Sequence, residues 1–365
     1  MDFTLSAEQL LLKDAVARYA AQPEQSRADA WTTFAQLGWL AVGAPEEAGG
    51  FGGPVETLLV MEALGRGRVV SPYLAQVVFA GAVLRASGRS DAIEAITEGA
   101  RRYAIAYEEP RSRYDASLVD TQARRSGDGW TLDGEKIRVL DAGSADTLIV
   151  SARTDRGCTL FTIDANAPGV ERRAYASEDG YDVADLSLRA VRADDGALLG
   201  GDGEGLAALE YGIDCTSAAL CAEALGLCAV MLEATVSYTK QRTQFGVPLS
   251  SFQALAHRMA EMYVELELLR SMAYYAAMTL SEQTDAVERQ RGISAAKAQV
   301  AKSGRFIGQQ AIQLHGGIGM SEEYDVGHYF KRMTLVERLL GDRDFHLRRY
   351  AELRRSAVAP EPVSV

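Results

Sequence analysis

A short run of polar and aromatic residues in the second half of the chain has the character of a phosphate-binding site. Arg242, Gln244 and Phe245 lie close together where a long helical pattern ends, and Phe252-Gln253 follows soon after. A guanidinium fork and amide groups suit a bridging phosphate, because a planar cation can bond two oxygens at once. The less specific interpretation is that Arg242 pairs with a carboxylate.

A second run lies farther along the chain, at the end of another helical pattern. It contains Gln313, then Gly316 and Gly317, with Gly319 close behind. Glycine has no Cβ, so a ligand can approach the backbone closely at such positions. The run therefore suits the face of a flat ligand, while the less specific interpretation is that the glycines only cap a helix.

Three stretches of different pattern must position these runs. Residues 1–100 show apolar residues at helical spacing, and they open with Ser6 and Gln9 as a capping box. Residues 101–198 hold short runs rich in β-branched and aromatic residues, and Asp133-Gly134 between two of them predicts a tight hairpin.

Long amphipathic patterns return over residues 199–356, and 357–365 read as a frayed tail. Long helices joined by short loops favour an antiparallel bundle. We therefore predict a mainly α protein with a central β-barrel domain: a helical domain, a small barrel or sandwich, and a four-helix bundle.

Composition excludes several classes of function. The 365 residues predict two or three packed units. Acidic residues outnumber basic ones by 50 to 38, so the net charge of −12 argues against nucleic-acid binding. Four cysteines without a C-x-x-C pair, and four histidines without ligand spacing, predict neither a disulfide framework nor a metal site.

No basic segment followed by an apolar run opens the chain, and the apolar stretch at 69–84 is too short to cross a bilayer. We therefore expect a cytoplasmic protein without a membrane partner. No G-x-G-x-x-G follows a strand, which disfavours a nicotinamide site, and no Walker P-loop is present. Ser237 and Lys240 match S-x-x-K without its companion motifs, so they make a poor nucleophile site.

In this order the segments resemble the acyl-CoA dehydrogenase family over essentially the whole chain. Besides the two runs, four further segments carry the resemblance: Leu37-Gly38-Trp39-Leu40, Gly49-Gly50-Phe51-Gly52-Gly53, Leu132-Asp133-Gly134-Glu135-Lys136 and Val150-Ser151-Ala152-Arg153-Thr154. The resemblance implies an FAD-dependent oxidoreductase that acts on an acyl-CoA thioester and passes electrons to an electron-transfer flavoprotein or a similar acceptor. It also implies the helix, barrel and bundle order.

In that family the two runs bind the pyrophosphate and adenosine end of FAD across a subunit interface. The resemblance therefore implies FAD contacts made to a neighbouring subunit's cofactor. The residues carried over are Arg242, Gln244, Phe245, Gln313, Gly316 and Gly317, with Phe252 and Gln253 as helpers.

The chain departs from the family at the catalytic base, which should be a glutamate. In one branch of the family the base aligns with Leu340, just before Gly341, and in the other with Thr216. Leucine cannot accept a proton, and threonine is far too weak a base near neutral pH. We therefore assign no catalytic residue.

The positions that should contact the flavin ring also depart from the family. The usual Thr-Glu-Pro-x-Ala-Gly-Ser-Asp is replaced by Glu108-Glu109-Pro110-Arg111-Ser112-Arg113-Tyr114-Asp115. The usual Trp-Ile-Thr aligns with Arg138-Val139-Leu140, which removes the stacking aromatic and the hydroxyl donor. The half-site for the ring is thus eroded, while the half-site for the adenosine end is intact.

This asymmetry resembles the non-catalytic small subunits of bacterial two-component acyl-CoA dehydrogenases, such as that of pimeloyl-CoA dehydrogenase, which serve in fatty acid, steroid or dicarboxylic acid catabolism. It predicts a heterotetramer whose second subunit carries the catalytic glutamate. One alternative is a stand-alone enzyme with Asp342 or Asp344 as a relocated base, although Asp342 also suits a helix cap before Phe345. A flavin monooxygenase or oxidase, or a non-redox homologue, on the same fold is a further alternative.

Overall fold

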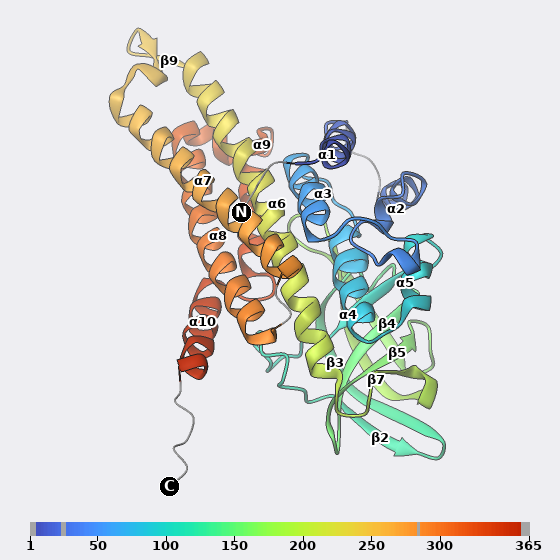
Figure 1. Cartoon of the computed structure of the whole chain (residues 1–365). Helices are drawn as coiled ribbons and strands as arrows, with labels where there is room; N and C mark the ends of the chain where they lie inside the picture. Colours follow the sequence, from blue (N-terminus) through green and yellow to red (C-terminus); the bar gives the residue numbers. More distant parts are fainter. Residues whose placement is uncertain (1–4, 23–26, 283–284, 359–365) are drawn as a thin grey trace. The chain divides into compact units, whose positions relative to one another are not determined.

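The computed structural model describes residues 5–22, 27–282 and 285–358. The chain forms two compact units: unit 1 comprises Met1–Pro23, Pro54–Val69 and Ser217–Val365, and unit 2 comprises Glu24–Gly53 and Val70–Thr216. Of the predicted tail at 357–365, residues from 359 on lie outside the described part, and 357–358 belong to the last helix. The predicted mainly α fold with a central β domain is confirmed (Figure 1).

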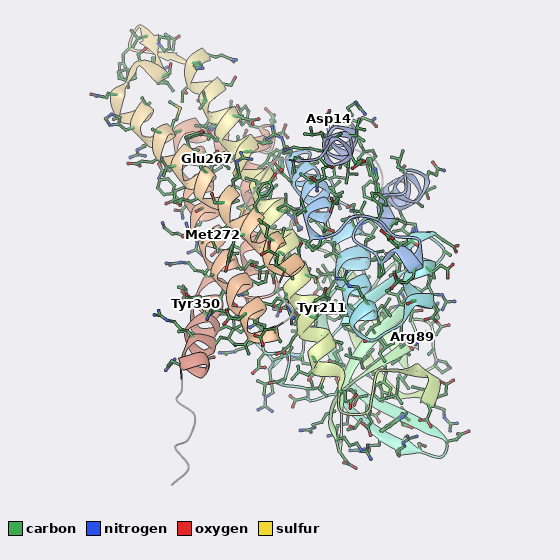
Figure 2. All side chains as sticks on the ribbon, in the orientation of Figure 1. Asp14, Arg89, Tyr211, Glu267, Met272 and Tyr350 are labelled. Atoms are coloured by element: carbon green, nitrogen blue, oxygen red, sulfur yellow. The ribbon has the colours of Figure 1, made fainter. Side chains whose placement is uncertain are left out.

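The helical part of unit 2 is short-segmented and packed around aromatic rings. Phe34 lies 5.3 Å from Trp39 and 6.2 Å from Tyr73, centroid to centroid. Tyr211, labelled in Figure 2, accepts a hydrogen bond from Arg85, whose guanidinium also lies 5.2 Å from the ring centroid. The elements are α2 (Arg27–Gln36), η1 (Trp39–Ala41), η2 (Glu46–Ala48), the π-helix η3 (Tyr73–Ala80), α4 (Gly81–Ala86) and α5 (Ser90–Thr97).

The rest of unit 2 is one mixed eight-stranded sheet with an apolar core. Its order is β6-β7-β3-β2-β4-β5-β8, and β1 pairs with β4 in parallel. Trp130, Leu132, Leu148 and Phe161 are almost fully buried in the core. The strands are β1 (Tyr103–Ala106), β2 (Gln122–Ser126), β3 (Gly129–Leu140), β4 (Thr147–Thr154), β5 (Gly157–Asp164), β6 (Val170–Ala176), β7 (Asp182–Asp194) and β8 (Leu198–Leu199), with η4 (Asp195–Ala197) before the last.

The predicted hairpin at Asp133-Gly134 is wrong. Both residues lie inside β3, and the β2–β3 turn falls earlier, because Ser126 pairs with Gly129. The Asp133 carboxylate accepts the Ala190 backbone N–H at 2.8 Å, and the pairing of β3 with β7 shifts register there. The Asp-Gly pair therefore forms an irregularity within a strand, a use of glycine that strand patterns also allow.

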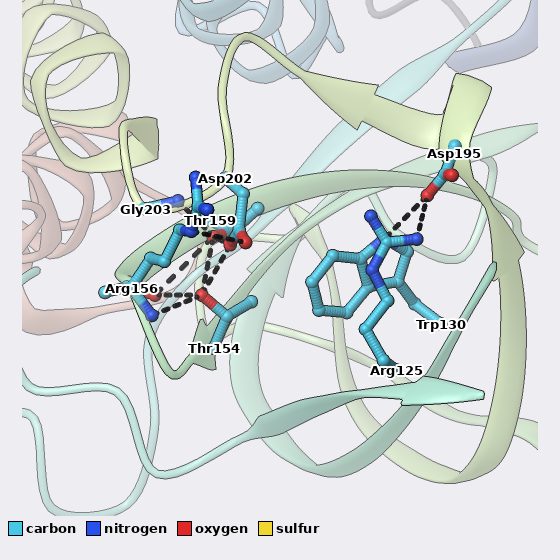
Figure 3. Close-up of polar contacts among 9 residues, drawn as sticks. Arg125, Trp130, Thr154, Arg156, Thr159, Asp195, Asp202 and Gly203 are labelled. Carbon is cyan, nitrogen blue, oxygen red and sulfur yellow. Dashed lines mark hydrogen bonds and ion pairs between the residues drawn. The ribbon is translucent and has the colours of Figure 1, made fainter. Parts of the chain in front are cut away.

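Two polar clusters lie at strand ends in the sheet, one near the β4–β5 turn and one near the β2–β3 turn (Figure 3). Asp202 accepts hydrogen bonds from Thr154 and Thr159 at 2.6 and 3.2 Å, which holds the glycine-rich linker that leads into α6. Asp195 accepts hydrogen bonds from Arg125 and from the Trp130 indole at 2.6 and 3.1 Å.

Unit 1 is built on long helices that run side by side in Figure 1. The predicted capping box is confirmed at its first helix: Ser6 accepts the Gln9 N–H, and the Gln9 side chain accepts the Ser6 N–H. The elements are α1 (Ala7–Ala20), α3 (Pro54–Arg66), α6 (Gly205–Gln241, which begins in unit 2), β9 (Thr243–Gln244), β10 (Val247–Pro248), η5 (Leu249–Ser251), α7 (Gln253–Glu282), α8 (Ala286–His315), η6 (Gly316–Met320), α9 (Asp325–Arg338) and α10 (Arg343–Val358).

The helix α6 is the longest and among the most enclosed. One 18-residue window has a mean hydropathy of 1.8, which is apolar enough to cross a bilayer, but 89% of that window is buried inside the fold. A helix at the centre of a bundle has this character because it is apolar all round. The apolar stretch that the sequence analysis singled out, 69–84, contributes the π-helix η3 and part of α4.

Candidate functional site

The first predicted run forms the tip of a helical hairpin. Beyond the end of α6, β9 and β10 pair antiparallel. Phe245 and Gly246 make the two-residue turn between them, with φ of 53° and 80°, the left-handed conformations that such a turn requires. Phe245 is 90% exposed there, and β9 lies at the projecting end of the hairpin in Figure 1.

The polar side chains of the tip all face solvent. Arg242, Gln244 and Gln253 are exposed, and Phe252 is half-buried. The rings of Phe245 and Phe252 meet edge to face, 6.2 Å apart. In the described part of the chain no carboxylate forms an ion pair with Arg242, so its guanidinium is available to an external anion.

The second run forms the end of α8. Gln313 is exposed, and Gly316 caps the helix with φ of 63°. A Cβ placed on Gly316 or on Gly317 would have no atom within 4 Å, so the space over both glycines is open. The backbone there is therefore accessible to a flat group, as the sequence predicts.

An aromatic stack joins the two runs. The ring of Tyr238, on the last turn of α6, lies 4.6 Å from that of His315 in a stacked arrangement, and Tyr324 lies 5.0 Å from His315. The His315 Nδ1 lies 2.8 Å from the Ala311 carbonyl oxygen, and burial lowers the pKa of the imidazole. These three rings lie beside the two runs, and spacing along the chain gives no signal that they stack.

This donor set fits the diphosphate and adenosine part of FAD. It offers an uncompensated guanidinium, three exposed amides, aromatic rings and open glycine backbone on adjoining helix ends. Guanidinium and amide N–H groups bond phosphate oxygens, and aromatic faces suit a purine. The residues at the tip can therefore bind and orient such a ligand.

Comparison with known proteins decides the family. The acyl-CoA dehydrogenase N-terminal domain matches residues 6–96, the middle domain 104–195 and the C-terminal domain 203–353. The chain belongs to the acyl-CoA dehydrogenase family. Acyl-CoA dehydrogenases are FAD-dependent oxidoreductases, so the predicted cofactor and enzyme class are confirmed at this level.

Individual relatives agree. The short-chain specific acyl-CoA dehydrogenase of Megasphaera elsdenii is 30% identical over 265 residues, covering 69% of this chain and 67% of the relative. The ChsE4-ChsE5 complex from Mycobacterium tuberculosis has a TM-score of 0.86 at 27% identity, covering 99% of this chain and 100% of that one. A variant of the Tcur3481-Tcur3483 steroid ACAD has a TM-score of 0.86 at 30% identity, covering 98% and 100%.

The segment that departs from the acyl-CoA dehydrogenase pattern around the ring is held by an ion pair. Arg138 donates to one Glu108 oxygen from Nε and Nη2, at 3.0 and 2.7 Å, while the Tyr107 hydroxyl donates to the other oxygen at 3.1 Å. Burial acts to lower the pKa of Arg138, but Glu108 outweighs it and raises the pKa. The residue that aligns with the stacking aromatic is thus a cation engaged with its own chain.

A second ion pair fixes the same segment from inside the sheet. Lys136, fully buried, donates to Glu109 at 2.6 Å and to Ser151 at 2.9 Å. The Glu109 carboxylate also accepts the backbone N–H groups of Asp120 and Thr121, at 2.5 and 3.1 Å. Burial acts to raise the pKa of Glu109, but Lys136 and these donors lower it overall, which favours the charged carboxylate.

Neither aligned base position can accept a proton. Leu340 is buried with φ of 59°, and it opens the turn between α9 and α10. The Thr216 hydroxyl is buried and donates to the Gly212 carbonyl at 2.7 Å within α6. The Asp342 carboxylate accepts the Phe345 N–H at 2.8 Å, so the helix-cap interpretation of Asp342 is confirmed.

Next to the turn that contains Leu340, Lys297 of α8 is buried with its ammonium against the end of α9. It donates to the carbonyls of Val336 and Glu337 at 2.7 and 3.2 Å, and lies 3.5 Å from that of Gly341. Burial lowers the pKa of Lys297 from 10.5 to about 8. The charge is retained near neutral pH because carbonyl oxygens replace the lost water.

We expect Lys297→Met to lower the free energy of unfolding, because the carbonyls of Val336 and Glu337 lose their donor. The variant should also lack a pH dependence of that free energy which the native chain has. Between pH 8 and 10.5 the unfolded chain binds the lysine proton more tightly than the folded chain, so the free energy of unfolding rises with pH in that window. Relative to Lys297→Met, the native chain should gain roughly 2 kcal/mol between pH 7.5 and 9.5. Urea unfolding of both proteins across this range measures the difference, and parallel curves would contradict it.

Proposed function

We propose that this chain is the supporting subunit of a two-component acyl-CoA dehydrogenase. Its Arg242, Gln244, Gln313 and the glycines after α8 hold the adenosine and diphosphate end of FAD. A partner subunit of the same fold supplies the ring pocket and the catalytic glutamate. FAD held there would supply the hydride acceptor for oxidation of the acyl thioester, and the partner's glutamate would take up the α-proton.

One asymmetry carries the proposal. The tip and the α8 end present uncommitted donors and open backbone, whereas the ring-side positions are occupied by Arg138 paired with Glu108. The base positions hold Leu340 and Thr216. A chain that served its own flavin would need both halves, and a chain that had lost FAD would need neither.

Two structural relatives support a two-chain assembly, because each carries a pair of names. They are the ChsE4-ChsE5 complex and the Tcur3481-Tcur3483 steroid ACAD. We therefore favour a heterotetramer with two copies of each chain, which acts on a bulky acyl-CoA in lipid or steroid catabolism in the cytoplasm. An electron-transfer flavoprotein or a similar acceptor reoxidises the flavin.

Co-expression with a candidate partner that retains the glutamate tests the proposal. We expect one FAD per pair of chains, a native mass of four chains, and a nearly colourless protein when this chain is expressed alone. One FAD per chain in the assembly, or stoichiometric flavin in the lone protein, would overturn the proposal.

The stand-alone alternative predicts that Asp342 or Asp344 is the base, and the capping bond of Asp342 argues against the first of them. We expect Asp342→Ala to leave the turnover number of the assembly unchanged. The loss of the cap should cost about 1 kcal/mol of stability. Steady-state kinetics with an acyl-CoA and an electron acceptor, together with a melting curve, measure both. A loss of turnover in a fully folded variant would favour the relocated base.

A further inference from the structure

A second arginine lies close to the tip of unit 1. Arg258, in the second turn of α7, is exposed, and its Nη1 donates to the Gln310 side chain of α8 at 3.3 Å. Gln310 lies one helical turn before Gln313, which already belongs to the candidate site. Arg258 itself is not part of the sequence-predicted set.

Contacts between the helices fix the level of Arg258 relative to the site. Thr239 of α6 lies 3.2 Å from the Met259 sulfur of α7, so the last turn of α6 is level with the second turn of α7. Because α6 and α7 run antiparallel, the positions of Arg242 and Arg258 along the bundle axis differ by less than about one helical turn. Gln310 places the end of α8 at the same level, so both arginines and Gln313 gather around one end of the bundle.

The charge environment of these two arginines leaves both guanidinium groups available to an anion. Several other arginines of the bundle, such as Arg270, Arg291, Arg305 and Arg332, each form an ion pair with a glutamate. Arg242 and Arg258 form none with any described residue, and the hydrogen-bond partner of Arg258 is the neutral amide of Gln310. Both side chains are exposed.

We propose that Arg258 is a second binding residue for the diphosphate of FAD, oriented by Gln310. The inference rests on the proposed function and extends it. A diphosphate bridge carries two negative charges, and one guanidinium can neutralise only one of them. Arg242 at the hairpin and Arg258 on the helix supply one cation each, and the amide of Gln310 directs the Arg258 fork without competing for its charge.

The test uses the two-chain assembly, stripped of flavin and titrated with FAD while flavin fluorescence is followed. We expect Arg258→Ala to raise the FAD dissociation constant about tenfold, as the loss of one charge-assisted contact does. Arg258→Lys should recover part of the affinity. Arg291→Ala, which removes a half-buried arginine that already has a glutamate partner, serves as the control and should leave FAD affinity unchanged.

The salt dependence gives a second readout that a purely structural role would not change. The decrease of FAD affinity with KCl should be shallower for Arg258→Ala than for the native assembly, because one fewer ionic contact is screened. If Arg258→Ala behaves like the control while Arg242→Ala loses flavin, this inference is wrong and the proposed function stands. If neither variant loses affinity, both are wrong.

Discussion

Replacing Arg242 with alanine is expected to weaken FAD binding by the two-chain assembly about 10- to 100-fold. A hydrogen bond to a charged group contributes about 1.5–3 kcal/mol, and each 1.4 kcal/mol is a factor of ten in affinity. The guanidinium is exposed and forms no ion pair in the described part of the chain, so its removal should cost the fold little. Flavin fluorescence during reconstitution, with native mass to verify assembly, measures the effect.

The neighbouring tip residue gives the control for this prediction. Val247, which is 40% exposed on the same hairpin, has no polar group to bond a phosphate. A Val247→Ala variant should therefore retain FAD, so that a loss specific to Arg242→Ala reports on charge and not on disturbance of the hairpin. Equal flavin content in both variants would remove Arg242 from the site.

Replacing Arg332 with methionine is expected to lower the free energy of unfolding by about 3–5 kcal/mol. Arg332 of α9 and Glu223 of α6 are each 3% exposed, and the guanidinium bonds both carboxylate oxygens, at 2.6 and 2.8 Å. The variant leaves Glu223 buried without its cation, and a buried charge without a partner is costly. Urea unfolding at fixed protein concentration measures the change.

Two further variants separate the buried charge from the loss of packing. The double variant Glu223→Leu with Arg332→Met replaces the pair by apolar side chains and should recover most of the stability. Arg291→Met breaks a pair on α8 whose side chains are 34% and 38% exposed, so it should change the free energy of unfolding by less than about 1 kcal/mol. A single Arg332 variant as stable as the Arg291 variant would contradict the prediction.

The sequence predicts the helical framework closely, because long amphipathic patterns reflect burial directly. The long amphipathic patterns of residues 199–356 appear as long helices at Gly205–Gln241, Gln253–Glu282 and Ala286–His315. The same reasoning fails at Asp133-Gly134, where a local turn signal is overridden by the pairing of β3 with β7. Local propensity indicates where a strand can turn, whereas its neighbours decide whether it does.

The two runs of the site could be found from residue types, but their meeting could not. The stack of Tyr238 on His315 joins residues far apart along the chain, and the contact of Arg258 with Gln310 joins two helices. Neither follows from periodicity, which gives the buried face of a helix but not its partner. The pairing of Arg138 with Glu108 is of the same kind: the sequence indicates which family residues are missing, while the fold determines what their replacements contact.

The ion pair of Arg138 with Glu108 makes the proposed dependence on a partner difficult to reverse by mutation. The Glu108 side chain is only 12% exposed, so an Arg138 substitution alone would leave a largely enclosed carboxylate without its cation. Restoring a ring pocket would require changes at Glu108, at Arg138 and along the intervening loop, and each of them taken singly is disadvantageous. Under the proposed function, no single substitution therefore leads from this chain back to one with its own ring pocket without a loss of fitness. Under the proposed function, the genes for this chain and its partner should be inherited, and lost, together.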